Sequence, residues 1–223
     1  MKRITITFLA LAMVAMVAMI AYATNEVTSV NVVGYSKIEA PGRQLVLKAI
    51  PFDAFDQTLK GVFGTNQLSK GTAKGGYSTA DKIYIWDPSI PKYHIYAQDS
   101  DGTFYDIEDW GGSPVTNEVM TAGTAFWFFS ADSEGTTNEV TIMGEVVGAP
   151  TQLVDIVEGL QLVSYGFSCD IGVPDLDFVN DGANLGTAKG GYSTADRVYI
   201  WDPSSGYTIY APDETGTWYD IED

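Results

Sequence analysis

Four carboxylates grouped around Gly102 could bind a cation: Asp99, Asp101, Asp106 and Glu108. Alternate Asp residues before a Gly, with a carboxylate further on, form the pattern by which a loop wraps oxygen ligands around calcium. Ala97, however, stands where an EF-hand loop would place its first ligand, and a related stretch near the C-terminus has Thr215 in place of Asp101. Because Asp-Gly is also a good turn pair, a solvated acidic turn is the favoured interpretation. Calcium is the one cofactor that the pattern suggests.

Aromatic residues at repeated positions could bind carbohydrate by stacking on sugar rings: Trp86, Trp201 and Trp218. Trp201 corresponds to Trp86, and Trp218 corresponds to Phe104, when the two halves of the chain are aligned. Alternation of aromatic residues along a strand fits packing in a core equally well. Core packing is therefore the favoured interpretation, and a sugar platform is the alternative.

Catalytic signatures are scarce in this sequence. The single histidine, His94, aligns with Thr208, so a His-dependent triad or zinc site could exist only once. The repeated GTAKGG sequence lacks the spacing of a phosphate-binding loop, and its glycines are expected to permit positive φ in a turn. We therefore predict that the protein is not an enzyme. A glycan-active enzyme with paired carboxylates is the remaining alternative.

Charge and cysteine content restrict the classes of partner. The chain has 12 basic residues against 29 acidic ones, and binding to phosphate backbones or anionic lipids depends on clustered Lys and Arg. Nucleic acid is therefore excluded as a partner. The single cysteine, Cys169, cannot form an intramolecular disulfide and is expected to be a buried thiol.

The first 23 residues have the pattern of a secretory signal peptide. Lys2 and Arg3 precede an apolar run that ends near Ile20, and the small residues of Ala21-Tyr22-Ala23 follow it. We predict cleavage before Thr24, export to the periplasm, cell surface or extracellular space, and no membrane contact after cleavage. An uncleaved anchor is the alternative, because the apolar run is close to the minimum length that crosses a bilayer.

The rest of the chain contains two copies of one repeat. Residues 71–89 recur at 186–204 with 17 of 19 positions identical, and residues 93–109 match residues 207–223. Self-similarity of this kind is typical of tandem modules. We therefore predict a signal peptide at 1–23, a first repeat at 24–136, and a second repeat at 137–223 that lacks the counterpart of residues 110–136.

Short strands separated by turns account for most of each copy, because apolar and polar residues alternate with period two. Hairpins are predicted over 82–98 and 197–212. One short helix is predicted from four apolar residues at helical spacing, with Asp53 as its N-cap and Gly64 as its stop: Phe55, Leu59, Val62 and Phe63. A weaker trace of the same helix lies around residues 174–179. The predicted fold class is mainly β, with two tandem β-sandwich or barrel-like repeats that each carry one short helix.

A set of motifs in the first copy resembles a repeat of uncharacterised secreted β proteins from bacteria of the Verrucomicrobia, Planctomycetes and Lentisphaerae group. The motifs are Asn31-Val32-Val33-Gly34-Tyr35, Ala40-Pro41-Gly42, the YxWDPxxxxY hairpin, an aromatic strand and Gly144-Glu145-Val146. The resemblance covers the first copy nearly whole and the second copy up to residue 223. It implies an exported β module and carries no catalytic residues.

Taken together, these features predict a non-enzymatic structural or adhesive repeat module of the cell surface or extracellular space. A carbohydrate-binding or calcium-binding module is the alternative. The second copy lacks an aromatic strand equivalent to residues 125–129, so we expect either that the sequence continues in a longer chain or that another molecule supplies a strand. The predicted partners are accordingly a glycan or further copies of the protein joined by strand donation.

Overall fold

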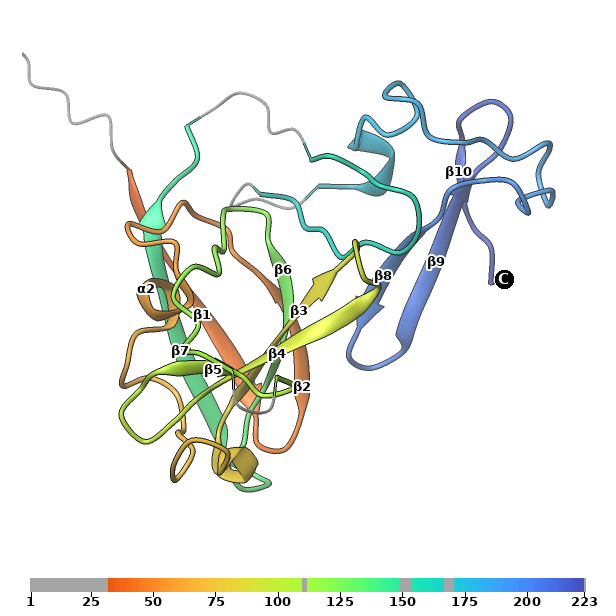
Figure 1. Cartoon of the computed structure of the whole chain (residues 1–223). Coiled ribbons are helices and arrows are strands. Elements are labelled where there is room, and N and C mark those ends of the chain that lie inside the picture. Colours follow the sequence, from red (N-terminus) through yellow and green to blue (C-terminus); the bar gives the residue numbers. More distant parts are fainter. Residues whose placement is uncertain (1–31, 110–111, 149–153, 167–170, 223) are drawn as a thin grey trace, which may run out of the picture. The chain divides into compact units, whose positions relative to one another are not determined.

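A computed structural model describes residues 32–109, 112–148, 154–166 and 171–222, and it is mainly β (Figure 1). In the first copy the strands are β1 (Val33–Pro41), β2 (Leu45–Ala49), β3 (Lys82–Asp87), β4 (Lys92–Gln98), β5 (Phe104–Asp106) and β6 (Ala125–Phe129). We group β7 (Thr137–Glu145) with this copy because it pairs with β1, although its residues belong to the second repeat in the sequence. In the second copy they are β8 (Val198–Asp202), β9 (Gly206–Pro212) and β10 (Trp218–Asp220). The helical segments are α2 (Leu59–Phe63) and the 3₁₀ turns η1 (Tyr77–Thr79) and η2 (Val173–Asp175). The predicted fold class is confirmed.

Two antiparallel sheets build the first copy. One has five strands in the order β2-β6-β3-β4-β5, so β6 lies between β2 and β3. The other is the pair β1 and β7, in register from Val33 opposite Glu145 to Pro41 opposite Thr137. Thr137 also opens the second repeat in the sequence. The strand that begins at Thr137, β7, thus pairs with β1 of the first copy.

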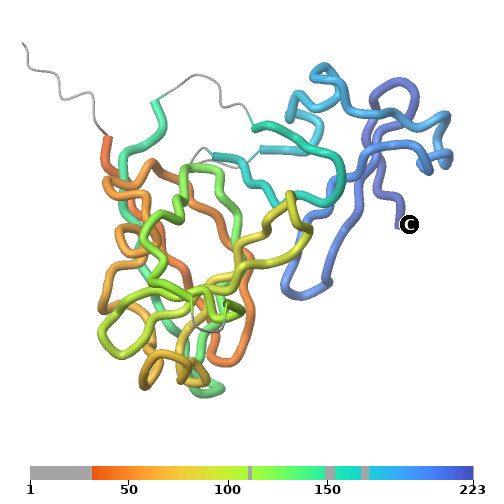
Figure 2. The backbone as a smooth tube through the Cα atoms, viewed as in Figure 1, coloured from red at the N-terminus to blue at the C-terminus, as the bar shows by residue number. Residues whose placement is uncertain are grey.

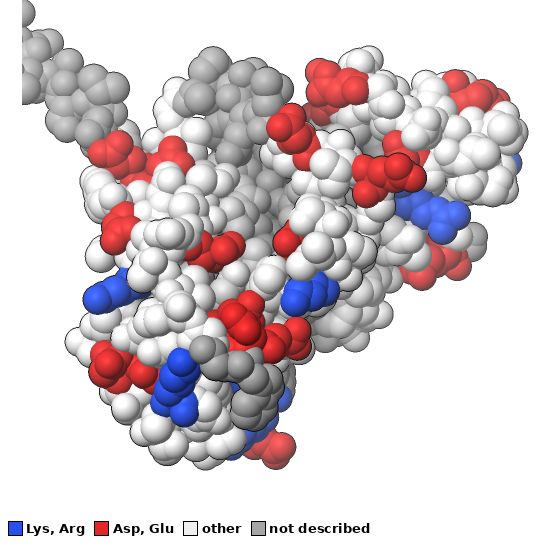
Figure 3. All heavy atoms as spheres, in the orientation of Figure 1, with Lys and Arg blue, Asp and Glu red and all other residues white. Residues whose placement is uncertain are grey.

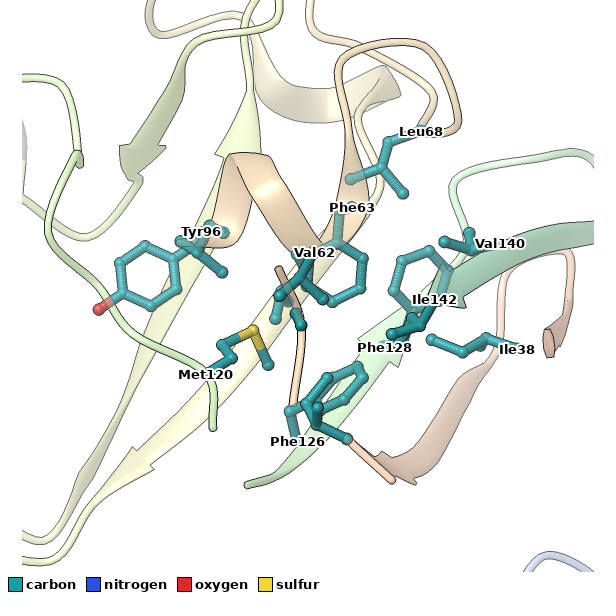
Figure 4. Packing of buried hydrophobic residues seen from close by; sticks show 14 of the residues in the cluster. Ile38, Val62, Phe63, Leu68, Tyr96, Met120, Phe126, Phe128, Val140 and Ile142 are labelled. Carbon is teal, nitrogen blue, oxygen red and sulfur yellow. The ribbon is translucent and has the colours of Figure 1, made fainter. Parts of the chain in front are cut away.

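A single hydrophobic core joins these two sheets through α2 (Figure 4). Phe63 of α2 packs edge to face on Phe126 of β6, with ring centroids 5.5 Å apart, and stacks on Phe128 at 6.5 Å. Buried aliphatic residues of β1 and β7 close the opposite side: Ile38, Val140 and Ile142. Because burying a side chain of this size contributes about 1.5–3 kcal/mol, this cluster holds the β1–β7 pair and α2 against one face of the five-stranded sheet. The result is the expected sandwich-like layering.

The two predicted hairpins are confirmed as β3–β4 and β8–β9 (Figure 2). The same turn chemistry closes both of them. Asp87 Oδ1 accepts a hydrogen bond from the Ser89 amide at 2.8 Å, and Asp202 Oδ1 accepts one from the Ser204 amide at 2.7 Å. An Asp that bonds the backbone two residues on is a common way to begin a turn.

The predicted helix exists, but it begins later than the sequence suggests. Thr58 is its N-cap and accepts a hydrogen bond from the Gly61 amide at 3.1 Å. The expected cap, Asp53, instead pairs its backbone with Glu145, with both N···O distances at 2.9 Å. This pairing keeps Asp53 in an extended backbone, and Phe55 is 69% exposed. The expected stop at Gly64 is confirmed, with φ +66°.

Several predictions concern residues that lie outside the described ranges or differ between the copies. The signal peptide at 1–23 and Cys169 are outside the described residues. The helix trace predicted around 174–179 is the 3₁₀ turn η2. Among the described helices, none has both the length and the apolar character needed to cross a bilayer.

Candidate functional site

The acidic turn uses its carboxylates to hold its own backbone. Asp99 Oδ1 accepts hydrogen bonds from the amides of Asp101 and Thr103, both at 3.1 Å. Asp101 Oδ1 accepts a second bond from the Thr103 amide at 2.9 Å, and hydrogen bonds from Thr103 lower the pKa of Asp101. Gly102 completes the turn at φ +87°. These oxygens therefore have partners without a cation.

The second copy repeats this turn with different side chains. Asp213, the counterpart of Asp99, accepts hydrogen bonds from the amides of Thr215 and Thr217 at 2.8 and 3.0 Å. The Thr215 hydroxyl also donates to Asp213 Oδ1, at 2.6 Å. A threonine hydroxyl thus takes the place of the Asp101 carboxylate. The shared element of the two turns is the first Asp.

The other two predicted metal ligands lie elsewhere, so the structure does not bring the four carboxylates together. Asp106 is in β5, and its Oδ2 lies 2.7 Å from Nδ1 of His94 in β4. Its Oδ1 accepts a hydrogen bond from the Glu108 amide at 3.0 Å. Within the described residues, no three side chains of His, Cys, Asp or Glu form a group that could hold a metal ion.

Two of the predicted stacking residues, Trp86 and Trp201, occupy matched aromatic clusters. Trp86 packs edge to face on Tyr93, with centroids 4.9 Å apart and an interplanar angle of 68°. Trp201 packs on Tyr207 at 4.9 Å and 65°. A further tyrosine completes each cluster, Tyr84 in the first copy and Tyr199 in the second.

The third predicted residue, Trp218, lies apart from these clusters. It takes the position of Phe104, which is buried in the core of the first copy, and its ring packs 6.4 Å from that of Phe178. Trp86 and Trp201 thus share their tyrosine neighbours but differ in their other contacts, since Trp201 also packs edge to face on Trp127 at 5.2 Å and the Trp86 indole donates to the Leu160 carbonyl.

The GTAKGG loop, for which the sequence predicted only a turn, forms the same surface arrangement of side chains in both copies. Lys74 extends over the ring of Tyr105 at 5.1 Å, and Lys189 extends over Tyr219 at 4.8 Å. Tyr77 and Tyr192 lie beside these rings at 6.4 and 6.2 Å. We call each group of a lysine and two tyrosines a Lys-Tyr cluster. An ammonium group over an aromatic ring is an attractive cation–π arrangement.

Each Lys-Tyr cluster is held by the same loop geometry. The Thr72 amide donates to the Gly76 carbonyl, and the Thr187 amide donates to the Gly191 carbonyl, both at 3.0 Å. Gly75 and Gly190 adopt φ +87° and +90°, which glycine reaches without steric cost. Positive φ was expected at both pairs, Gly75-Gly76 and Gly190-Gly191, and it is confirmed at Gly75 and Gly190 but not at Gly76, whose φ is −99°, or at Gly191.

In the first copy the loop borders a pocket of about 480 Å³. Its lining combines lysine, tyrosine and carboxylate side chains with exposed backbone: Lys74, Gly75, Tyr77, Ser78, Lys82, Tyr105, Asp106, Ile107 and Asp109. Burial raises the pKa of Tyr77, and the Gly75 amide opposes part of that rise. The phenol is therefore neutral at physiological pH, and its hydroxyl oxygen is buried without a hydrogen-bond partner among the described residues.

The sequence did contain a signal for this site. The exposed loop residues are identical in the two copies: Thr72, Ala73, Lys74, Gly75, Ser78 and Thr79. Outside the loop, both kinds of position changed: buried Ile83 became Val198, and exposed Asp101 became Thr215. Exposed loop residues tolerate substitution more readily than core residues unless they bind something. Their identity across the duplication points to a role for the loop.

The charged side chains on one face of the molecule are mostly acidic. Acidic side chains are spread widely over the face shown in Figure 3, and the basic side chains described there form no continuous patch. Such a surface does not attract polyanions.

Comparison with known proteins does not assign the chain to a class. No protein-family model, no curated protein and no solved structure matches it significantly. The function is therefore inferred from the described geometry.

Proposed function

We propose that the protein is a non-enzymatic, exported structural or adhesive module of the cell surface or extracellular space, and that its Lys-Tyr clusters are the contact sites. The observation that carries this proposal is the duplication of one exposed geometry, with Lys74 over Tyr105 and Lys189 over Tyr219. Two equal sites on one chain bind a repetitive surface with an avidity roughly 10²–10⁴ times either affinity. Two sites of this kind would therefore strengthen attachment of the protein to a repetitive surface.

Binding of the protein to a glycan array and to isolated cell envelopes tests this proposal. We expect the double variant Lys74→Ala/Lys189→Ala to lose binding, and each single variant to weaken it by roughly 10²-fold through loss of avidity. Lys60→Ala is the matched control, because Lys60 is exposed on α2 and outside both clusters. Full binding by the double variant would overturn the proposal.

A second candidate function is carbohydrate binding by the Tyr-Trp-Tyr cluster of the second copy. Its supporting observation is that Tyr199 and Tyr207 are 43% and 45% exposed, so both offer ring surface for stacking. In the first copy, by contrast, the Trp86 indole donates a hydrogen bond to the Leu160 carbonyl at 2.6 Å. Glycan binding lost in Tyr199→Ala and kept in the double lysine variant would favour this second function.

A further inference from the structure

The pocket beside the Lys-Tyr cluster of the first copy is lined by equal numbers of positive and negative side chains. Two lysines, Lys74 and Lys82, and two carboxylates, Asp106 and Asp109, border its volume of about 480 Å³. This volume lies within the range of roughly 300–1,000 Å³ that is usual for small-molecule sites. The pocket extends beyond the cluster itself, because Lys82 belongs to β3 and Asp106 belongs to β5.

Both lysines of the pocket are held in place without being neutralised. Lys74 lies over the ring of Tyr105 and donates a hydrogen bond to the Gly112 carbonyl at 2.7 Å. The Nζ of Lys82 lies 5.2 Å from the ring centroid of Phe129. Within the described residues, neither lysine forms an ion pair with a carboxylate. Since an ammonium group has three N–H donors, both lysines keep donors for a ligand.

The Asp106 carboxylate is fixed from two sides. Its Oδ1 accepts a hydrogen bond from the Glu108 amide at 3.0 Å, and its Oδ2 lies 2.7 Å from Nδ1 of His94. Each carboxylate oxygen can accept more than one hydrogen bond, so Asp106 can still accept one from a ligand hydroxyl. Side chains that are ordered before binding lose little conformational freedom when a ligand arrives.

The charges of the lining restrict the charge of the ligand. An anion would be repelled by Asp106 and Asp109, in a chain that has 29 acidic residues and 12 basic ones. A cation would be repelled by Lys74 and Lys82. A wholly apolar ligand would remove these charged groups from water without replacing their hydrogen bonds. The lining therefore fits an uncharged ligand whose hydroxyl groups both accept from a lysine and donate to a carboxylate.

The remaining side chains of the lining supply apolar surface. Tyr77 and Tyr105, with ring centroids 6.4 Å apart and an interplanar angle of 40°, line the pocket together with Ile107. Tyrosine combines a large apolar ring with one polar group. Hydroxyl groups on the rim of a ring, with C–H groups on its faces, are the chemistry of a sugar residue.

The second copy retains the residues of this pocket in its sequence. Of the nine lining residues, eight are identical in the second copy, and the ninth, Lys82, is replaced by Arg197, which is also a cationic donor. A direct neighbour is not retained, because His94, which contacts Asp106, is replaced by Thr208. Donors and acceptors of the lining are thus kept while a residue behind it changes, as expected of a site that binds the same ligand in both copies.

We propose that the pocket binds one neutral sugar residue of a glycan. Lys74 and Lys82 donate hydrogen bonds to its hydroxyl groups, Asp106 and Asp109 accept hydrogen bonds from them, and the tyrosine rings pack against its C–H groups. This inference rests on the proposed function, because Lys74 and the two tyrosines belong to the Lys-Tyr cluster, and it names the ligand of that contact site.

Binding of the full chain to neutral and acidic glycans at two salt concentrations tests the ligand class. The neutral probes are oligosaccharides of glucose, xylose and mannose, and the acidic probes are oligomers of galacturonic acid and mannuronic acid. We expect a neutral probe to bind, with an affinity that changes less than about twofold between about 0.1 M and about 1 M salt, because salt screens interactions between charges.

The outcomes separate this inference from the proposed function. Binding to the acidic probes alone, or to no probe, by a chain that still binds cell envelopes through Lys74 and Lys189 would overturn the neutral sugar and leave the proposed function standing. Envelope binding that survives in Lys74→Ala/Lys189→Ala would contradict the proposed function instead.

Two double variants test the lining itself in both copies. Lys82→Met/Arg197→Met removes cationic donors, and Asp106→Asn/Asp220→Asn removes anionic acceptors. Each should weaken binding of the neutral probe at least about tenfold through lost charge-assisted hydrogen bonds. Unchanged binding by either folded double variant would overturn the proposal.

Matched controls and melting curves accompany these variants. Lys60→Met and Glu134→Gln change exposed residues outside the pocket and should bind as the wild type does. Melting curves check that each variant is folded. The Lys82→Met/Arg197→Met variant leaves the contact between His94 and Asp106 intact, so it decides the outcome if the carboxylate variant is destabilised.

Discussion

His94 and Asp106 form a close pair across β4 and β5, with Nδ1 of the histidine 2.7 Å from Oδ2 of the aspartate. Asp87 lies on the other side of the ring, with Oδ2 3.5 Å from Nε2. Tyr96 stacks on the imidazole at 6.1 Å. The second copy keeps both carboxylates, as Asp202 and Asp220, but has Thr208 in place of the histidine.

This pair predicts a pH dependence of stability that belongs to the first copy. The hydrogen bond to Asp106 is the main cause that raises the pKa of His94, with a smaller contribution from Asp87, whereas burial of the ring and, less strongly, Lys92 oppose the rise. The stabilising contribution of a group with a raised folded-state pKa is complete below its unfolded pKa, about 6.5 for His, and is lost as the pH rises through the folded-state pKa.

Melting curves of the wild type and His94→Thr measure this effect. We expect the melting temperature of the wild type to exceed that of the variant at acidic pH, and this difference to shrink by roughly 2 °C on passing to alkaline pH. Thr208→His is the reciprocal test, because it places a histidine between Asp202 and Asp220 and should create the same dependence. A difference that is constant with pH would contradict the assignment.

Asp81 is buried and its counterpart Asp196 is exposed, so the same substitution should lower the free energy of unfolding by different amounts at the two positions. Asp81 is fully buried, and its carboxylate accepts hydrogen bonds from the amides of Ser69 and Ala131 and from the Asn138 side chain. Asp81→Ala leaves these buried and part-buried donors without this acceptor and should lower the free energy of unfolding by about 3–5 kcal/mol. Asp196→Ala changes an exposed side chain and should cost less than about 1 kcal/mol. Denaturant unfolding of the two variants checks this, and similar midpoints would contradict the role of Asp81.

The acidic turn is expected to need no cation. Since Asp99 and Asp101 already accept backbone amides, we expect millimolar calcium to leave the melting temperature unchanged. Asp99→Ala should nevertheless lower the free energy of unfolding by about 1–2 kcal/mol, because it removes the side-chain acceptor of the Asp101 amide and one of the two side-chain acceptors of the Thr103 amide. A calcium-dependent rise in melting temperature that Asp101→Asn abolishes would show a metal site instead.

Export should produce a shorter chain. On the pattern of Lys2-Arg3, the apolar run and Ala21-Tyr22-Ala23, we expect N-terminal sequencing of the exported protein to begin at Thr24. The substitution Ala23→Trp should block cleavage, because the cleavage site needs a small residue at this position. Recovery of the wild-type chain from membranes with Met1 or Lys2 as its first residue would contradict this prediction.

Local patterns in the sequence were sufficient to predict the two hairpins and the end of α2. A strand with alternating side chains next to an Asp-Pro-Ser turn depends on interactions a few residues apart, such as Asp87 with Ser89. Such interactions can be predicted from the sequence because the interacting residues are close together in the chain. The same is true of Gly64, because a glycine with positive φ ends a helix through its local backbone conformation and needs no distant partner.

Tertiary structure decided the features that depend on distant partners. Asp53 has the side chain of a helix cap, but backbone pairing with Glu145 holds it extended, and Thr58 caps the helix instead. Thr137 opens a repeat in the sequence, yet the strand it begins pairs with β1. Asp81 and Asp196 occupy corresponding positions in the two copies, but Asp81 is buried and Asp196 is exposed. Burial and hydrogen bonding at these positions come from segments far along the chain, so the residue type alone could not predict them.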